Sequence, residues 1–175
     1  MPSPLGHALA GIAAGCAILP SRVGRMAVFA SVGMAADLDL LLPIAHRGPA
    51  HSVTAAVVVA VATLAVLLIT RPVPADSVRI ALAMGAAYLT HVLLDWLGAD
   101  GGPPSGIMAL WPFSSHYYVS GLDVFSGLER RYWLSGFWRQ NLISVVREII
   151  ILAPIAVMVI VLSKRGDRHP PAEVE

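Results

Sequence analysis

Apolar residues run through the chain in five long stretches separated by short polar segments. Each stretch is predicted to form a helix, because it contains few charged side chains and ends near proline, glycine or arginine. The predicted helices cover residues 5–20, 26–44, 51–70, 77–97 and 142–163. Segment 51–70 is uncharged and long enough to cross about 30 Å of hydrocarbon. Segment 5–20 is marginal in length, so it forms either a short span or a re-entrant helix.

This pattern predicts an all-α integral membrane protein, a helical bundle of about five transmembrane helices. Hydrophobic residues make up 57% of the 175 residues and charged residues 13%, against about 45–50% and about 25% in soluble domains. We expect one membrane-embedded helical domain over residues 1–165, surrounded by the lipid bilayer, and a flexible polar tail over 166–175. The net charge of +1 comes without a basic face, which argues against nucleic-acid binding.

The connection between the fourth and fifth predicted helices, residues 98–140, is long and rich in aromatic residues. Connections of this length in a compact bundle are usually functional or disordered, and the aromatic content favours a functional one. Residues 128–139 mix aromatic side chains with arginines, as expected for a segment at the level of the lipid headgroups.

Basic residues are distributed differently at the two ends of the predicted bundle. With five spans, one side of the membrane carries its basic residues in short loops at helix ends, and the other carries them mainly in the long connection. The first set is Arg22, Arg25, Arg71, Arg79, Lys164, Arg165 and Arg168, and the second is Arg47, Arg130, Arg131, Arg139 and Arg147. Because positively charged short loops stay in the cytoplasm, the N-terminus and the connection are predicted to face outward.

The same alternation brings eight polar residues to the outward side: His7, Asp37, Asp39, His46, His51, His91, Asp95 and His116. His91 and Asp95 are four residues apart and therefore project from one helix face. Asp37 and Asp39 are two apart, so they meet a common centre only if the helix ends there, which Pro43 favours. Ionisable groups in a membrane are costly, and such a gathering is predicted to be functional.

Histidine and aspartate without cysteine are ligands typical of Zn²⁺, with Mn²⁺ and Fe²⁺ as alternatives. The number of candidate ligands indicates two or more ions, an arrangement used for phosphoester cleavage by metal-activated water. Asp95 or Asp39 is the candidate general base, and Arg47 is a candidate phosphate-binding residue. His116, in the connection, is a candidate ligand or acid, or has no role.

Five short motifs, taken in order, carry a resemblance to a known family. They are His7-Ala-Leu-Ala-Gly11, Asp37-Leu-Asp39, His46-Arg47-Gly48-x-x-His51-Ser52, His91-x-x-x-Asp95 and Trp111-Pro112-Phe113. Over about residues 1–120 the chain resembles the YdjM-like family of bacterial inner-membrane metal-dependent hydrolases. The resemblance implies a multi-pass inner-membrane protein distantly similar to zinc-dependent phospholipase C and P1-type nucleases. It also implies a set of metal ligands: His7, Asp37, Asp39, His46, His51, His91 and Asp95.

Three functions are compatible with these residues. A membrane-bound metal-dependent hydrolase acting on a phosphoester in a lipid or lipid-linked headgroup fits a site at the outer, periplasmic boundary. A divalent-cation transporter, or a metal-binding membrane protein without hydrolase activity, is the alternative, although transporters place ligands near the bilayer midplane. A scaffold with a structural metal is the third, although structural zinc sites use four ligands, fewer than the candidates here.

Overall fold

The computed structural model describes residues 1–41, 46–70, 74–100 and 102–166. This part of the chain contains five α-helices and two short 3₁₀ helices, and it has isolated β-bridges but no strand. The elements are α1 (Pro4–Ile18), α2 (Val23–Met34), η1 (Ala35–Leu41), η2 (Pro49–His51), α3 (Val53–Thr70), α4 (Pro74–Leu97) and α5 (Phe137–Gly166). The prediction of an all-helical fold is confirmed.

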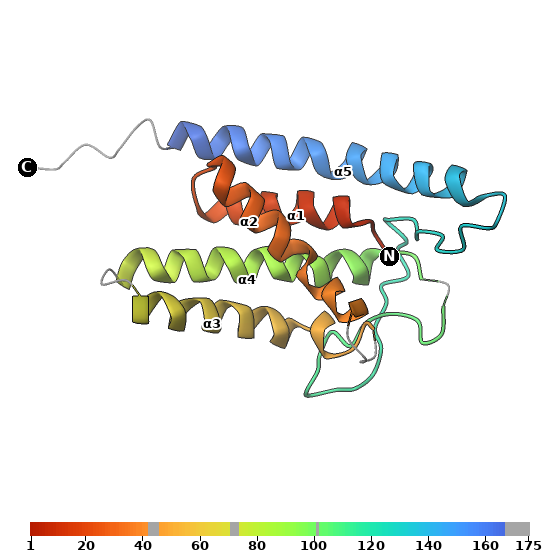
Figure 1. The fold of residues 1–175 in the computed structure, drawn as a ribbon, viewed down its shortest axis with the longest axis horizontal. Coiled ribbons are helices and arrows are strands. Elements are labelled where there is room, and N and C mark those ends of the chain that lie inside the picture. Colours follow the sequence, from red (N-terminus) through yellow and green to blue (C-terminus); the bar gives the residue numbers. More distant parts are fainter. Residues whose placement is uncertain (42–45, 71–73, 101, 167–175) are drawn as a thin grey trace, which may run out of the picture.

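The helices lie side by side and alternate in direction along the long axis of the molecule (Figure 1). Helix α1 packs against α2, α4 and α5, and α3 packs against α4. One buried cluster joins three of these helices through Cys16, Phe29, Ala83 and Ala87. The N-terminus, η1, η2 and the connection gather at one end of the bundle, which we call the site end (Figure 1).

Three helical segments in the described part are long and apolar enough to cross a membrane: Val53–Thr70, Asp76–Leu97 and Phe137–Lys164. Helix α3 exposes large aliphatic side chains such as Val57, Val61 and Leu68, as expected for a surface in contact with lipid. Helix α1 is apolar but has 15 residues, which gives a length of about 22 Å. Its length therefore agrees with the marginal span expected from the sequence.

Helices α1 and α2 approach closely at two glycines. A Cβ atom added at Gly11 would lie 2.5 Å from the carbonyl oxygen of Phe29, and one at Gly33 would lie 2.5 Å from that of His7. Real Cβ atoms do not come this close to other atoms, so only glycine fits at both positions. This close approach places the backbone of α2 beside His7.

Two of the predicted helices, the second and the last, differ most from the observed ones. The second helix runs over Val23–Met34 and not over 26–44, and its continuation, Ala35–Leu41, is a 3₁₀ helix. The last helix begins at Phe137 and not at 142, because the aromatic residues 137–138 belong to its first turn and not to the connection. Asp37 and Asp39 lie in the 3₁₀ segment, where residues two apart point about 120° from each other. Pro43 and residues 167–175 of the predicted tail lie outside the described residues.

Candidate metal centre

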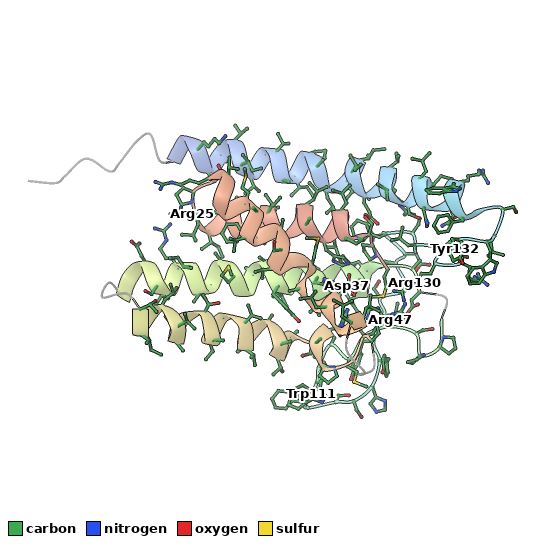
Figure 2. The ribbon with its side chains drawn as sticks, viewed as in Figure 1. Arg25, Asp37, Arg47, Trp111, Arg130 and Tyr132 are labelled. Carbon is green, nitrogen blue, oxygen red and sulfur yellow. The ribbon has the colours of Figure 1, made fainter. Side chains whose placement is uncertain are left out.

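Five of the predicted ligands converge at the site end of the bundle. His7 comes from α1, Asp37 from η1, His51 from η2, and His91 and Asp95 from α4. All but Asp37 are at most 3% exposed. Figure 2 places Asp37 where η1 meets α4 and the connection. Segments far apart in the sequence therefore bring imidazoles and carboxylates into one buried cluster.

Four donor atoms in this cluster lie close together across four histidine–aspartate pairs. His51 Nε2 lies 3.6 Å from Asp37 Oδ1 and 3.4 Å from Asp95 Oδ2. His91 Nε2 lies 3.5 Å from Asp37 Oδ1 and 3.3 Å from Asp95 Oδ2. Zinc binds imidazole and carboxylate at about 2.0–2.1 Å in tetrahedral sites, which puts neighbouring ligand atoms about 3.3–3.4 Å apart. These four distances are therefore close to those between neighbouring ligands of one small divalent cation.

Hydrogen bonding supports the same interpretation. In the described part of the chain, six buried side-chain atoms have no hydrogen-bond partner, and all six belong to this cluster. They are His7 Nδ1, both ring nitrogens of His51, His91 Nε2 and both oxygens of Asp95. A buried polar atom without a partner lowers the stability of the fold by about 1–3 kcal/mol, so six such atoms together would destabilise it strongly. A bound cation would satisfy donor atoms that point to a common centre.

Groups outside the cluster orient its histidines. The Nδ1–H of His91 donates to the carbonyl oxygen of Gly33 at 2.8 Å, which leaves Nε2 with its lone pair facing Asp37 and Asp95. Asp39 Oδ2 lies 3.3 Å from His51 Nδ1, again on the side away from the four donor atoms. Metal-ligating histidines usually direct their second nitrogen to a carbonyl or a carboxylate in this way.

The cluster has donors for more than one ion. Three groups of side chains each bring ligand atoms within 4.8 Å of one another: His7, Asp37 and His91; Asp37, His46 and His51; and His51, His91 and Asp95. His7 Nε2 also lies 3.4 Å from Asp95 Oδ1, the oxygen that does not belong to the four-atom set. The two oxygens of Asp95 therefore face different histidines, a geometry that suits a carboxylate between two neighbouring ions.

A family model described as YdjM inner membrane protein matches residues 1–166. The chain therefore belongs to the YdjM inner membrane protein family. No curated protein and no solved structure matches it. Membership of this inner-membrane family and the apolar helices both fit a membrane location. The match spans the whole cluster, so the predicted resemblance to YdjM-like proteins is confirmed.

Two predicted ligands of this YdjM-family protein, Asp39 and His46, lie at the edge of the cluster. Asp39 is 3% exposed and belongs to none of the three ligand groups found in the described part. Its Oδ1 lies 2.7 Å from His46 Nδ1, and its Oδ2 accepts from the backbone N–H of Arg47 at 3.3 Å. The carboxylate of Asp39 thus faces the Nδ1 atoms of two histidines, whereas those of Asp37 and Asp95 face Nε2 atoms.

Arg47 and His116 were predicted to act in catalysis. Arg47 has a positive φ of 67°, and its guanidinium forms an ion pair with Asp100. Burial raises the pKa of the Asp100 carboxyl, but hydrogen bonds from Arg47 and from the backbone N–H of Gly106 outweigh this and lower it overall. His116 is exposed on the connection and belongs to none of the ligand groups found among the described residues.

Two further charged residues adjoin the cluster and were not among the predicted site residues. The Nη2 atom of Arg130 lies 3.3 Å from His46 Nε2, and Figure 2 shows Arg130 at the site end near Asp37. Glu148 is fully buried in α5 and accepts hydrogen bonds from the backbone N–H of Ser3, at 2.7 Å, and from its hydroxyl. A carboxylate inside an apolar span indicates a specific partner. No such signal in the sequence identifies Arg130, because only the path of the connection brings it beside His46.

Proposed function

We propose that this protein is a membrane-bound metal-dependent hydrolase that cleaves a phosphoester in a lipid or lipid-linked headgroup. The observation that carries the proposal is the set of four inward-facing donor atoms on His51, His91, Asp37 and Asp95, which lie 3.3–3.6 Å apart across four pairs. The metal is Zn²⁺, with Mn²⁺ and Fe²⁺ as alternatives for the same nitrogen and oxygen ligands. His7 and His46 extend the set toward a second ion.

A bound divalent metal would lower the pKa of a water molecule and polarise a phosphoryl oxygen. The side chains around it have separate tasks. Asp39 holds His46 in orientation through its Nδ1 atom and lies 3.3 Å from Nδ1 of His51. Asp95 is the better placed general base of the two predicted when one ion is bound, because its Oδ1 lies outside the four-atom set and has no hydrogen-bond partner. In that one-ion state Oδ1 faces His7 Nε2 at 3.4 Å, so His7 can receive the proton in turn.

Arg130 is the arginine that we assign to the substrate phosphate, in place of Arg47. The guanidinium of Arg47 is held by Asp100, and that of Arg131 by Glu129 at 2.8 Å. None of the ion pairs among the described residues includes Arg130, which is exposed and lies beside His46. A planar guanidinium with unused donors matches a phosphate.

An apolar groove beside the cluster supports a lipid substrate. It has a volume of about 400 Å³ and lies between α3, α4 and the connection, with Val53, Leu93, Trp96 and Tyr118 among its lining residues. Val53 follows His51 by two positions, and Trp96 is next to Asp95. A groove of this kind at the same end as the cluster can hold an acyl chain while the headgroup reaches the polar residues.

We further propose five spans in the bacterial inner membrane, with the site end in the periplasm. Helix α2 and η1 contain 12 and 7 residues, which together give about 32 Å. Arg22, Arg25 and Arg79 lie at the end opposite the cluster, as the positive-inside rule requires for a cytoplasmic end. Labelling of single cysteines at Phe113 and at Arg22 in intact cells tests this, in a Cys16→Ala background. Labelling of Arg22→Cys but not of Phe113→Cys would show that the orientation is the opposite of the one proposed.

Hydrolysis by purified protein tests the proposed reaction. Detergent-solubilised protein loaded with Zn²⁺ would be incubated with phospholipids, bis-p-nitrophenyl phosphate and nucleotides. We expect release of a phosphorylated headgroup from lipid, loss of that release in His91→Ala and Asp95→Asn, and full activity in the exposed-loop control Asp123→Asn. Metal bound at full stoichiometry with no hydrolysis of any substrate, together with uptake of labelled Zn²⁺ by vesicles, would favour the transporter instead.

A further inference from the structure

The end of the bundle opposite the metal centre contains a second polar pocket. It has a volume of about 490 Å³ and lies between the α1–α2 turn and the first turns of α4. Its lining includes three arginines and one carboxylate beside apolar side chains: Arg22, Arg25, Arg79, Asp76, Leu19 and Ile80. Figure 2 shows Arg25 at this end, far from Asp37 and Arg130. We call it the arginine pocket.

The guanidinium groups of this pocket are positioned by backbone carbonyls. Arg25 Nη1 donates to the carbonyl oxygen of Pro20 at 3.3 Å, and Arg79 Nη2 donates to that of Ile18 at 3.1 Å. Ile18 is the last residue of α1 and Pro20 follows it by two positions, so both carbonyls lie at the helix end that carries partial negative charge. Each guanidinium has five N–H donors, so most remain available. None of the ion pairs within the described residues involves the three arginines or Asp76.

Two neighbouring elements add positive charge. Helix α2 begins at the pocket, and its N-cap, Arg22, makes no side-chain capping hydrogen bond, so the first backbone N–H groups still lack a capping acceptor. The hydroxyl of Ser21 donates to the carbonyl oxygen of Ile160 at 3.3 Å. This contact brings the last turns of α5 beside the α1–α2 turn, and Lys164 follows Ile160 by one turn.

We propose that the arginine pocket binds the phosphate of an anionic phospholipid in the membrane leaflet at this end of the bundle. Three cations face one carboxylate, and planar guanidinium groups suit phosphate oxygens. The apolar side chains of Leu19, just after α1, and Ile80, in the second turn of α4, suit the glycerol and acyl part of the same molecule. Basic pockets between membrane helices bind anionic headgroups through these features. The site is independent of hydrolysis at the other end.

Thermal unfolding of the full chain in lipid nanodiscs tests this site. We would titrate phosphatidylglycerol into phosphatidylcholine discs and measure the unfolding midpoint, with the variants Arg25→Gln plus Arg79→Gln, the charge-preserving Arg25→Lys plus Arg79→Lys, and Arg139→Gln as control. Arg139 is exposed on the first turn of α5, at the site end. Because each arginine near an anionic surface contributes about 1 kcal/mol, or about fivefold in affinity, we expect an apparent loss of about 30-fold in the Gln pair.

The Lys pair should retain most of the phosphatidylglycerol effect, and Arg139→Gln should retain all of it. The same dependence on phosphatidylglycerol in the unchanged protein and in the folded Gln pair would overturn the proposal. If the Gln pair does not fold, the Lys pair and the unchanged protein are used instead. If phosphatidylglycerol stabilises neither of these two proteins more than phosphatidylcholine does, the proposal is also overturned. An equal stabilisation by inorganic phosphate in phosphatidylcholine discs would refute the assignment to lipid.

Discussion

Replacement of Asp39 by Asn tests how the protein holds its histidines. The Asp39 carboxylate forms hydrogen bonds with His46 Nδ1 at 2.7 Å and with the backbone N–H of Arg47 at 3.3 Å, and its Oδ2 lies 3.3 Å from His51 Nδ1. Asparagine has nearly the same shape but one acceptor oxygen and an NH₂ group. At least one imidazole Nδ1–H must then face a donor, and that ring loses the partner that fixes its orientation.

The expected magnitude follows from this role. Loss of a partner behind a metal-ligating histidine typically weakens metal binding by about 10–100-fold, which corresponds to about 1.4–2.7 kcal/mol. The number of ions bound at saturation should not change, because the four atoms on His51, His91, Asp37 and Asp95 remain. A direct ligand would behave differently, since its removal eliminates an ion from the site.

Competition with a chromophoric zinc chelator, on detergent-purified protein at neutral pH, measures the affinity. The control is Asp123→Asn, because Asp123 is exposed in the connection and has a φ of 48°, a conformation that asparagine tolerates well. An affinity equal to that of the unchanged protein would show that Asp39 does not orient the ligands. Loss of an ion at saturation would show that Asp39 is itself a ligand, as the sequence predicted.

Three further outcomes follow from the packing around the site. Gly33→Ala should destabilise the protein by about 1–3 kcal/mol, because its Cβ would lie 2.5 Å from the carbonyl oxygen of His7. The control Gly136→Ala, which has open space around it, should not destabilise it. Equal unfolding midpoints of the two variants would contradict the close approach at Gly33. Glu148→Gln should cost about 1–3 kcal/mol by weakening the buried hydrogen bonds from Ser3, and an unchanged midpoint in thermal unfolding would argue against that contact. Chelation of the metal should lower the midpoint reversibly, since free metal at a hundred times Kd adds about 2.7 kcal/mol of stability; no shift on chelation and reloading would count against a metal at the site.

The sequence predicts the helices and that most of the polar residues gather at one end of the bundle. Long apolar stretches identify helices because the hydrocarbon thickness fixes their length. The alternation of spans then brings His7, His51 and His91 to one end, as the structure shows. No tertiary contact has to be known for this step.

The remaining features depend on contacts that no local pattern specifies. The switch of the second helix into a 3₁₀ segment at Ala35 follows the close packing at Gly33, whose carbonyl oxygen is held by His91. The pairing of Arg47 with Asp100 joins residues 53 positions apart. The position of Arg130 beside His46 depends on the path of the connection. Which arginine remains available to a phosphate therefore could not be read from residue types alone.

The metal content of the purified protein tests the central claim most directly. Protein loaded with Zn²⁺, freed of excess metal and analysed by inductively coupled plasma mass spectrometry should contain at least one zinc ion per chain. The double variant His51→Ala plus His91→Ala should contain none, while Asp123→Asn should retain the full amount. A folded, unchanged protein that binds no zinc, manganese or iron under these conditions would contradict a metal centre at this end of the bundle.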